Sequence, residues 1–147
     1  MLEWAHAYLA AATGAYEVQQ RGGSGDKGRD IVVWLDPPTV AARRWRLYQC
    51  KHYSDRLGTD KATVEIGKVL YYTATGEYSS PIEYWFVTHR GVSGPLQDLL
   101  DDPKKLRQFL LDNWDKYCSR GISDKAIPLT TSLTTHIEGF DFAIFRA

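Results

Sequence analysis

Asp30, Gln49 and Lys51 are the side chains in this sequence whose types and spacing best suit catalysis. Asp30 follows a glycine-rich segment and opens an apolar strand, whereas Gln49 and Lys51 lie on a later strand. Because successive side chains of a strand point to opposite faces, Gln49 and Lys51 share one face and Cys50 takes the other. If the two strands pair as a hairpin, the acid, the amide and the lysine converge. Such a group suits metal-assisted cleavage of a phosphodiester, in which the carboxylate holds a divalent cation and the lysine orients the attacking water.

The segments that carry these residues read Gly25-Asp26-Lys27-Gly28-Arg29-Asp30 and Gln49-Cys50-Lys51. Their order and spacing resemble the catalytic core of the PD-(D/E)xK nucleases, the restriction-endonuclease-like superfamily, and most closely its Mrr-like branch. That branch often carries an apolar-Glu pair in its first helix, and Leu2-Glu3 matches it. The resemblance covers roughly residues 1 to 90, and the remainder of the chain is compatible with it.

The resemblance implies a Mg²⁺-dependent DNA endonuclease, with Mn²⁺ as an alternative ion. Glu3, Asp30 and Gln49 would ligate or support the metal, and Lys51 would orient the water and stabilise the transition state. The implied substrate is double-stranded DNA, and the implied setting is bacterial restriction or anti-phage defence. Cutting both strands needs two active sites, so we expect a homodimer or higher assembly. A sensor or NTPase domain or subunit of a defence system is a further expected partner.

Each candidate also has an interpretation without catalysis. Asp30 could be a turn aspartate, Lys51 an edge-strand lysine, and Glu3 a first-turn acid that complements a helix dipole. Gln49 brings no charge, so we expect weaker metal affinity, and an inactive site stays open as an alternative. Asp26 is expected to be a turn residue rather than a further acid of the site.

Basic residues gather around these segments although the chain as a whole has a formal net charge of zero. The segment from Gln19 to His52 contains seven basic and three acidic residues, and this excess of positive charge predicts a local surface that binds a phosphate backbone. A solvated basic hairpin is the alternative. The predicted nucleic-acid contacts are Arg21, Lys27, Arg29, Arg43, Arg44 and His52.

The chain of 147 residues is expected to form one domain, residues 1–147. It holds no apolar run long enough to cross a membrane and no signal peptide, and we expect a cytoplasmic protein with no membrane partner. Cys50 and Cys118 are expected to be reduced thiols. The apolar tail ends two residues after Phe145, which favours the front domain of a longer polypeptide.

The elements that must position the site form an alternating pattern of strands and helices. The fold class is therefore α/β, with a restriction-endonuclease-like core: a central mixed sheet of about four or five strands with helices on both faces. A loop is expected over 122–135 with a short strand near 126–129, and the tail over 139–147 reads as a strand or a short helix. Helices are expected over 2–13, 59–75, 95–100 and from 103 to about 120, with Thr59 or Asp60 capping the second, and strands over 15–20, 29–35, 45–53 and 82–89.

Two other functions fit the same sequence. One is a nucleic-acid-binding domain on this fold with weak or no catalysis, which would bind DNA without a metal requirement. The other is a structural or interaction module of a larger complex. Mg²⁺-dependent nicking and salt-dependent DNA binding without metal separate the three functions, because an interaction module shows neither.

Overall fold

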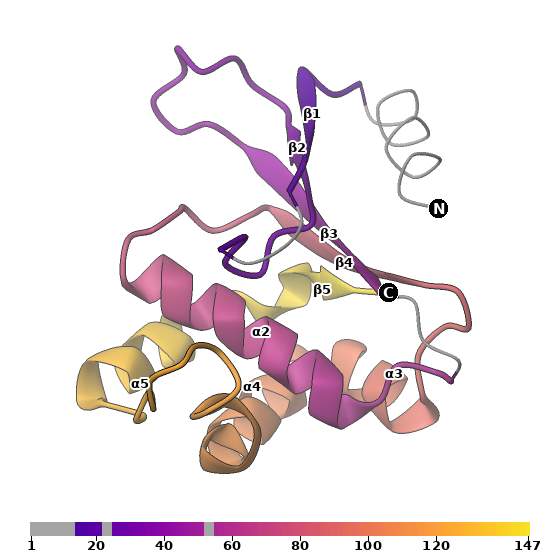
Figure 1. Cartoon of the computed structure of the whole chain (residues 1–147), viewed down its shortest axis with the longest axis vertical. Coiled ribbons are helices and arrows are strands. Elements are labelled where there is room, and N and C mark those ends of the chain that lie inside the picture. The colour runs from indigo at the N-terminus through magenta and orange to yellow at the C-terminus, as the bar shows by residue number, and fades with distance from the viewer. Residues whose placement is uncertain (1–13, 22–24, 52–54) are drawn as a thin grey trace.

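A mixed five-stranded sheet forms the centre of the protein (Figure 1). The computed structural model describes residues 14–21, 25–51 and 55–147. The strands lie in chain order, and the first two pairings are antiparallel whereas the last two are parallel. The predicted α/β class and the single mixed sheet are thus confirmed. The strands are β1 (Glu17–Gln20), β2 (Ile31–Trp34), β3 (Trp45–Lys51), β4 (Glu83–Thr88) and β5 (Phe145–Arg146).

The helices of the described residues lie together on one face of this sheet (Figure 1). Their apolar side chains form the main core with Val32, Trp45 and Leu47 of the sheet. The opposite face carries a smaller cluster around Ile31, Val33 and Tyr48. The described helices therefore do not confirm the expectation of helices on both faces, and the helix predicted over 2–13 lies outside the described residues. The helices are α2 (Thr59–Ala74), α3 (Gly94–Leu100), α4 (Pro103–Asp112), the π-helical turn η1 (Trp114–Cys118), α5 (Thr131–Gly139) and the 3₁₀ turn η2 (Phe142–Ile144).

Local sequence signals account for the starts of two helices and fail at a third. Asp102 accepts a hydrogen bond from the Lys105 amide and Pro103 takes the first helical position of α4, as predicted. Thr130 caps α5 in the same way through the Leu133 amide. The cap of α2 is Gly58, whose backbone is extended and which has no side chain to bond, so the predicted caps Thr59 and Asp60 were wrong.

The C-terminal third of the chain departs furthest from the prediction. Helix α5 begins inside the expected loop over 122–135, and the strand expected near 126–129 is absent from these described residues. Only Leu133 and Ile137 of α5 are buried, so its apolar face is too short to be recognised by its periodicity. The tail holds both expected forms in succession, a 3₁₀ turn and a strand of two residues paired with β4.

Three further predictions concern single features of the chain. Neither Cys50 nor Cys118 forms a disulfide, as expected. None of the described helices combines the length and the apolar character that crossing a membrane requires. Lys51 lies on β3, which pairs with β2 on one side and β4 on the other, so the edge-strand alternative was wrong.

Candidate active site

The pairing of β2 with β3 brings Asp30 to Gln49. The two strands form an antiparallel hairpin, as expected, in which Ile31 lies opposite Tyr48. Continuing that register by one pair places Asp30 opposite Gln49. The Cys50 amide donates a hydrogen bond of 3.1 Å to Asp30 Oδ2, so the carboxylate is fixed against β3.

Asp30, Gln49 and Lys51 belong to the sheet face that α2 covers. Val32, two residues after Asp30, and Leu47, two residues before Gln49, both lie in the main core beneath α2. Side chains at even spacing on a strand share a face, so the three candidates point the same way. Gln49 is only 4% exposed, which makes it one of the few buried polar side chains among the described residues.

A fourth polar side chain, Glu65 of α2, faces the sheet and pairs with Lys51. Lys51 Nζ lies 3.0 Å from Glu65 Oε1, and Lys68 Nζ lies 3.3 Å from the same oxygen. Glu65 is 6% exposed. The sequence analysis did not select it, although position 65 follows Ala62 by three residues and precedes Val69 by four. A charged residue on that apolar stripe is a signal that could have identified it.

Among the described residues, three side-chain oxygens are buried without a hydrogen-bond partner, and two of them, Gln49 Oε1 and Glu65 Oε2, belong to this site. An unsatisfied buried acceptor costs free energy, so such atoms are rare and often mark a binding site. Amide and carboxylate oxygens are the donors that Mg²⁺ and Ca²⁺ prefer. The chemistry of these two atoms, together with the Asp30 carboxylate, therefore fits a hard divalent cation.

Burial raises the pKa of the Asp30 carboxyl above its ordinary value of 3.8. The negative charges of Asp26 and Glu65 raise this pKa further, whereas the hydrogen bond from the Cys50 amide and the positive charge of Lys51 lower it. A cation bound at Asp30 would favour the ionised carboxylate, because an opposite charge stabilises it.

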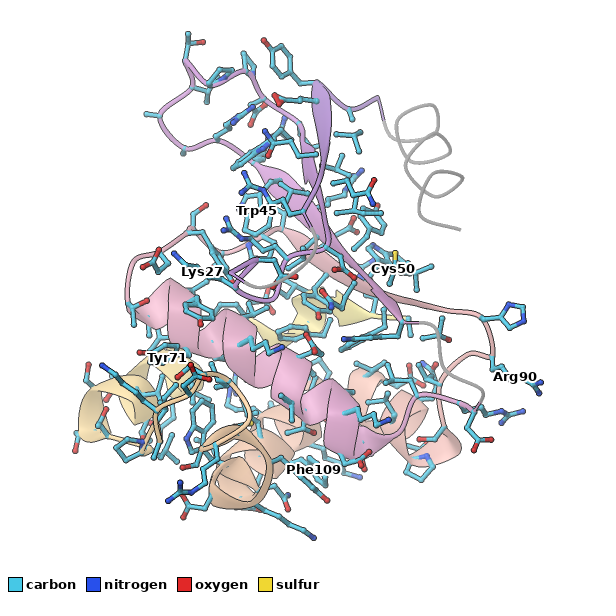
Figure 2. All side chains as sticks on the ribbon, in the orientation of Figure 1. Lys27, Trp45, Cys50, Tyr71, Arg90 and Phe109 are labelled. Carbon is cyan, nitrogen blue, oxygen red and sulfur yellow. The ribbon has the colours of Figure 1, made fainter. Side chains whose placement is uncertain are left out.

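The glycine-rich turn before β2 is held against α2. Gly28 has a φ of 82°, and a Cβ at this position would lie 3.0 Å from Lys68 Cβ, so the close approach of turn and helix requires glycine. Asp26 Oδ1 accepts a hydrogen bond from the Gly28 amide, which confirms that Asp26 is a turn residue. The Tyr78 hydroxyl donates to the Lys27 carbonyl, and Lys27 also forms an ion pair with Glu77. Figure 2 labels Lys27 in this turn, next to α2. This docking fixes where Asp30 enters the sheet.

The predicted nucleic-acid contacts fall into two groups rather than one surface. Arg21, Lys27 and Arg29 lie near Asp30: the Arg21 amide bonds the Asp30 carbonyl, and the Arg29 guanidinium stacks over the Tyr78 ring at 4.8 Å. Arg43 and Arg44 lie at the other end of the hairpin, beyond the pairing of Trp34 with Trp45.

Glu3 and His52, the other two predicted site residues, lie outside the described residues. In the described part of the chain, no group of three or more His, Cys, Asp and Glu side chains forms a metal cluster. The oxygen donors on this face are two carboxylates and one amide, supplied by Asp30, Glu65 and Gln49.

Comparison with known proteins gives no relative from which a function could be inferred. No protein-family model matches the chain, and neither the curated proteins nor the solved structures give a match. The function must therefore be argued from the geometry of this site.

Proposed function

We propose that this chain is a metal-dependent endonuclease that hydrolyses phosphodiester bonds of double-stranded DNA on a restriction-endonuclease-like core. The observation that supports the proposal is the convergence of Asp30, Gln49 and Lys51 at one end of the β2–β3 hairpin, on a single face. The arrangement β1 to β4, with α2 between the parallel strands β3 and β4, is compatible with that core.

Asp30 and Gln49 would hold the cation, with Glu3 as the further ligand implied by the resemblance. Mg²⁺, or Mn²⁺ in its place, supplies Lewis acidity that polarises a phosphoryl oxygen. The Cys50 amide donates a hydrogen bond to the Asp30 carboxylate, and Gln49 Oε1 accepts none from the described residues. Both residues would therefore bind a cation without rearrangement of the strands.

Lys51 would act on the attacking water and on the charge of the phosphate. Its ammonium group lies 3.0 Å from Glu65 Oε1, on the sheet face that Asp30 and Gln49 share, where it would orient the attacking water and offset the negative charge that develops on the phosphate. Lys51 is half-buried, so its charge acts with less screening than that of a surface lysine.

The partners in this proposal follow from the substrate. Cleavage of both DNA strands needs two copies of the site, which favours a homodimer or higher assembly. Arg21, whose amide bonds the Asp30 carbonyl, and Lys27 and Arg29, which precede Asp30 in the turn, would contact phosphates beside the cleaved bond. Arg43 and Arg44 would contact the backbone farther away. A role in restriction or anti-phage defence, with a sensor or NTPase partner, remains part of the proposal.

A DNA-binding domain without catalysis is the second candidate, and one observation favours it. The site residue Gln49 is neutral and Lys51 is ion-paired with Glu65, so a protein that had lost its metal could keep this arrangement as a structural feature. Such a protein would bind DNA in a salt-dependent way without divalent cations.

Incubation of the purified chain with supercoiled plasmid separates these candidates. We expect nicking or linearisation with Mg²⁺, none with EDTA, and a loss of at least about 100-fold in Lys51→Ala. Lys104→Ala, an exposed lysine of α4, is the matched control and should cleave like the parent. Full activity in Lys51→Ala, or cleavage that persists in EDTA, would contradict the proposal. DNA binding without any cleavage would favour the second candidate.

A further inference from the structure

We infer that Glu65 is the second carboxylate ligand of the metal site and takes the place of the acid that position 49 lacks. The inference rests on the proposed function, because it concerns the same site, but it can be tested without DNA. It assigns a role to a residue of α2 that the strand motif does not contain.

The strands of the site supply little negative charge for a cation. Gln49 provides an oxygen but no charge, so Asp30 would be the only anionic ligand on the hairpin. Metal affinity at oxygen sites depends on how many charged ligands take part. A second carboxylate reaching the site from another element would restore that charge, and Glu65 is positioned to do so.

The two oxygens of the Glu65 carboxylate differ in their partners. Both lysines engage Oε1, while Oε2 is buried and has no hydrogen-bond partner. A carboxylate that served only to pair the lysines would be expected to use both oxygens. Glu65 is joined to the strand residues through Lys51, whose Nζ lies 3.0 Å from Glu65 Oε1.

A second glutamate in the same protein shows the arrangement expected of a purely structural pair. Glu83 of β4 also lies between two cations, with Arg46 Nε 2.7 Å from Oε1 and Arg146 Nη1 3.3 Å from Oε2. Each Glu83 oxygen thus faces a different cation, whereas both lysines at Glu65 lie nearest the same oxygen. The Glu83 side chain is also more exposed than that of Glu65.

The acidic and basic side chains of the site balance each other in charge when no cation is bound. Asp30 and Glu65 carry two negative charges, and Lys51 and Lys68 carry two positive charges. The lysines therefore offset the negative charge of Glu65 in a buried place, where an unpaired charge would be costly. The open Oε2 stays available to a cation without the loss of either ion pair.

The test measures cation binding by titration calorimetry on the full chain, with Mn²⁺ and with Mg²⁺. Glu65→Gln keeps the size of the side chain and removes its charge, and we expect at least about tenfold weaker binding. The matched control is Glu83→Gln, which removes the charge of the other doubly paired glutamate and should bind like the parent. Circular dichroism of each variant checks its fold. Glu65→Asp provides a second variant that keeps the charge but withdraws the carboxylate by one methylene, and it should bind more weakly too.

Equal cation affinity in the parent and the Glu65 variants would overturn the inference, as would a parent that binds no cation. Plasmid cleavage measured in parallel keeps the two proposals apart. Cation binding that depends on Glu65 without cleavage would retain the metal site and reject the endonuclease. Cleavage and cation binding that are both unchanged in Glu65→Gln would retain the endonuclease and reject the role of Glu65.

Discussion

The two ends of the β2–β3 hairpin each hold an aspartate beside cationic side chains. Asp30 precedes β2 and Asp36 follows it. At the far end, Arg44 donates hydrogen bonds of 2.9 to 3.0 Å to both Asp36 oxygens, and Arg43 donates to the Asp36 carbonyl while its guanidinium stacks 3.8 Å from the Trp34 ring. The polar groups of this aspartate are thus satisfied within the hairpin.

The near end uses the same kinds of side chain differently. Asp30 is half-buried and its carboxylate accepts a hydrogen bond from the Cys50 amide, while Gln49 and Glu65 each keep one buried oxygen with no donor among the described residues. Burial raises the pKa of Asp30, whereas the hydrogen bonds from Arg44 lower the pKa of Asp36 to about 2. A structural end satisfies its own polar groups, and a site prepared for a ligand leaves some of them for that ligand.

The largest difference between the ends should appear in cleavage. Asp30→Asn keeps an acceptor for the Cys50 amide but removes the charge, and we expect a loss of at least about 100-fold in plasmid cleavage with Mg²⁺. Asp36→Asn should cleave within about twofold of the parent. A similar loss in both variants would remove the distinction between the two ends.

Removing the charged side chains should lower the free energy of unfolding at the Asp36 end but not at the Asp30 end. Replacing a buried ion pair by apolar side chains of similar size is often neutral or stabilising. The triple variant Lys51→Met/Glu65→Met/Lys68→Met, which replaces all three charges of this group, should therefore unfold in urea, without metal, with a free energy equal to the parent's or about 1 kcal/mol higher. Asp36→Met/Arg44→Met should be less stable than the parent, because it removes satisfied hydrogen bonds. A loss above about 2 kcal/mol in the triple variant would mark its ion pairs as structural.

The smallest expected difference between the two ends is in the pKa values of Asp30 and Asp36. In a carboxyl ¹³C NMR titration of the metal-free chain, Asp30 should titrate above 3.8 and Asp36 near pH 2. Because the folded-state pKa of Asp36 is depressed, its contribution to stability is present above about pH 4 and is lost as the pH falls toward 2. Asp30 has the opposite sign: its raised pKa reduces stability as the pH rises through 3.8. Equal pKa values would contradict the comparison.

The strand residues of the site were accessible to sequence analysis because their relation is local. Alternation along β3 put Gln49 and Lys51 on one face, and the hairpin expected from the spacing brought Asp30 to them. The turn role of Asp26 followed from the ordinary behaviour of aspartate near glycine. The helix over α2 and the cap of α4 were predicted from patterns that span only a few residues.

The basic residues show where such local reasoning stops. Counting charges between Gln19 and His52 treated them as one surface, whereas the hairpin sends Arg43 and Arg44 to the end away from Asp30. Which basic side chains lie close together depends on the register of the strands and on the ion pairs that these side chains form. A count of charges along the chain gives no information on either.

The sequence by itself determined the α/β class, the hairpin and the shared face of Asp30, Gln49 and Lys51, because periodicity and turn chemistry act over short distances. Only the tertiary structure decided that Glu65 stands above Lys51, that Gly28 must pack on Lys68, and that the C-terminal strand pairs with β4. These contacts join segments far apart in the chain. They exist because burying the apolar face of α2 on the sheet fixes which polar side chains meet at its edge.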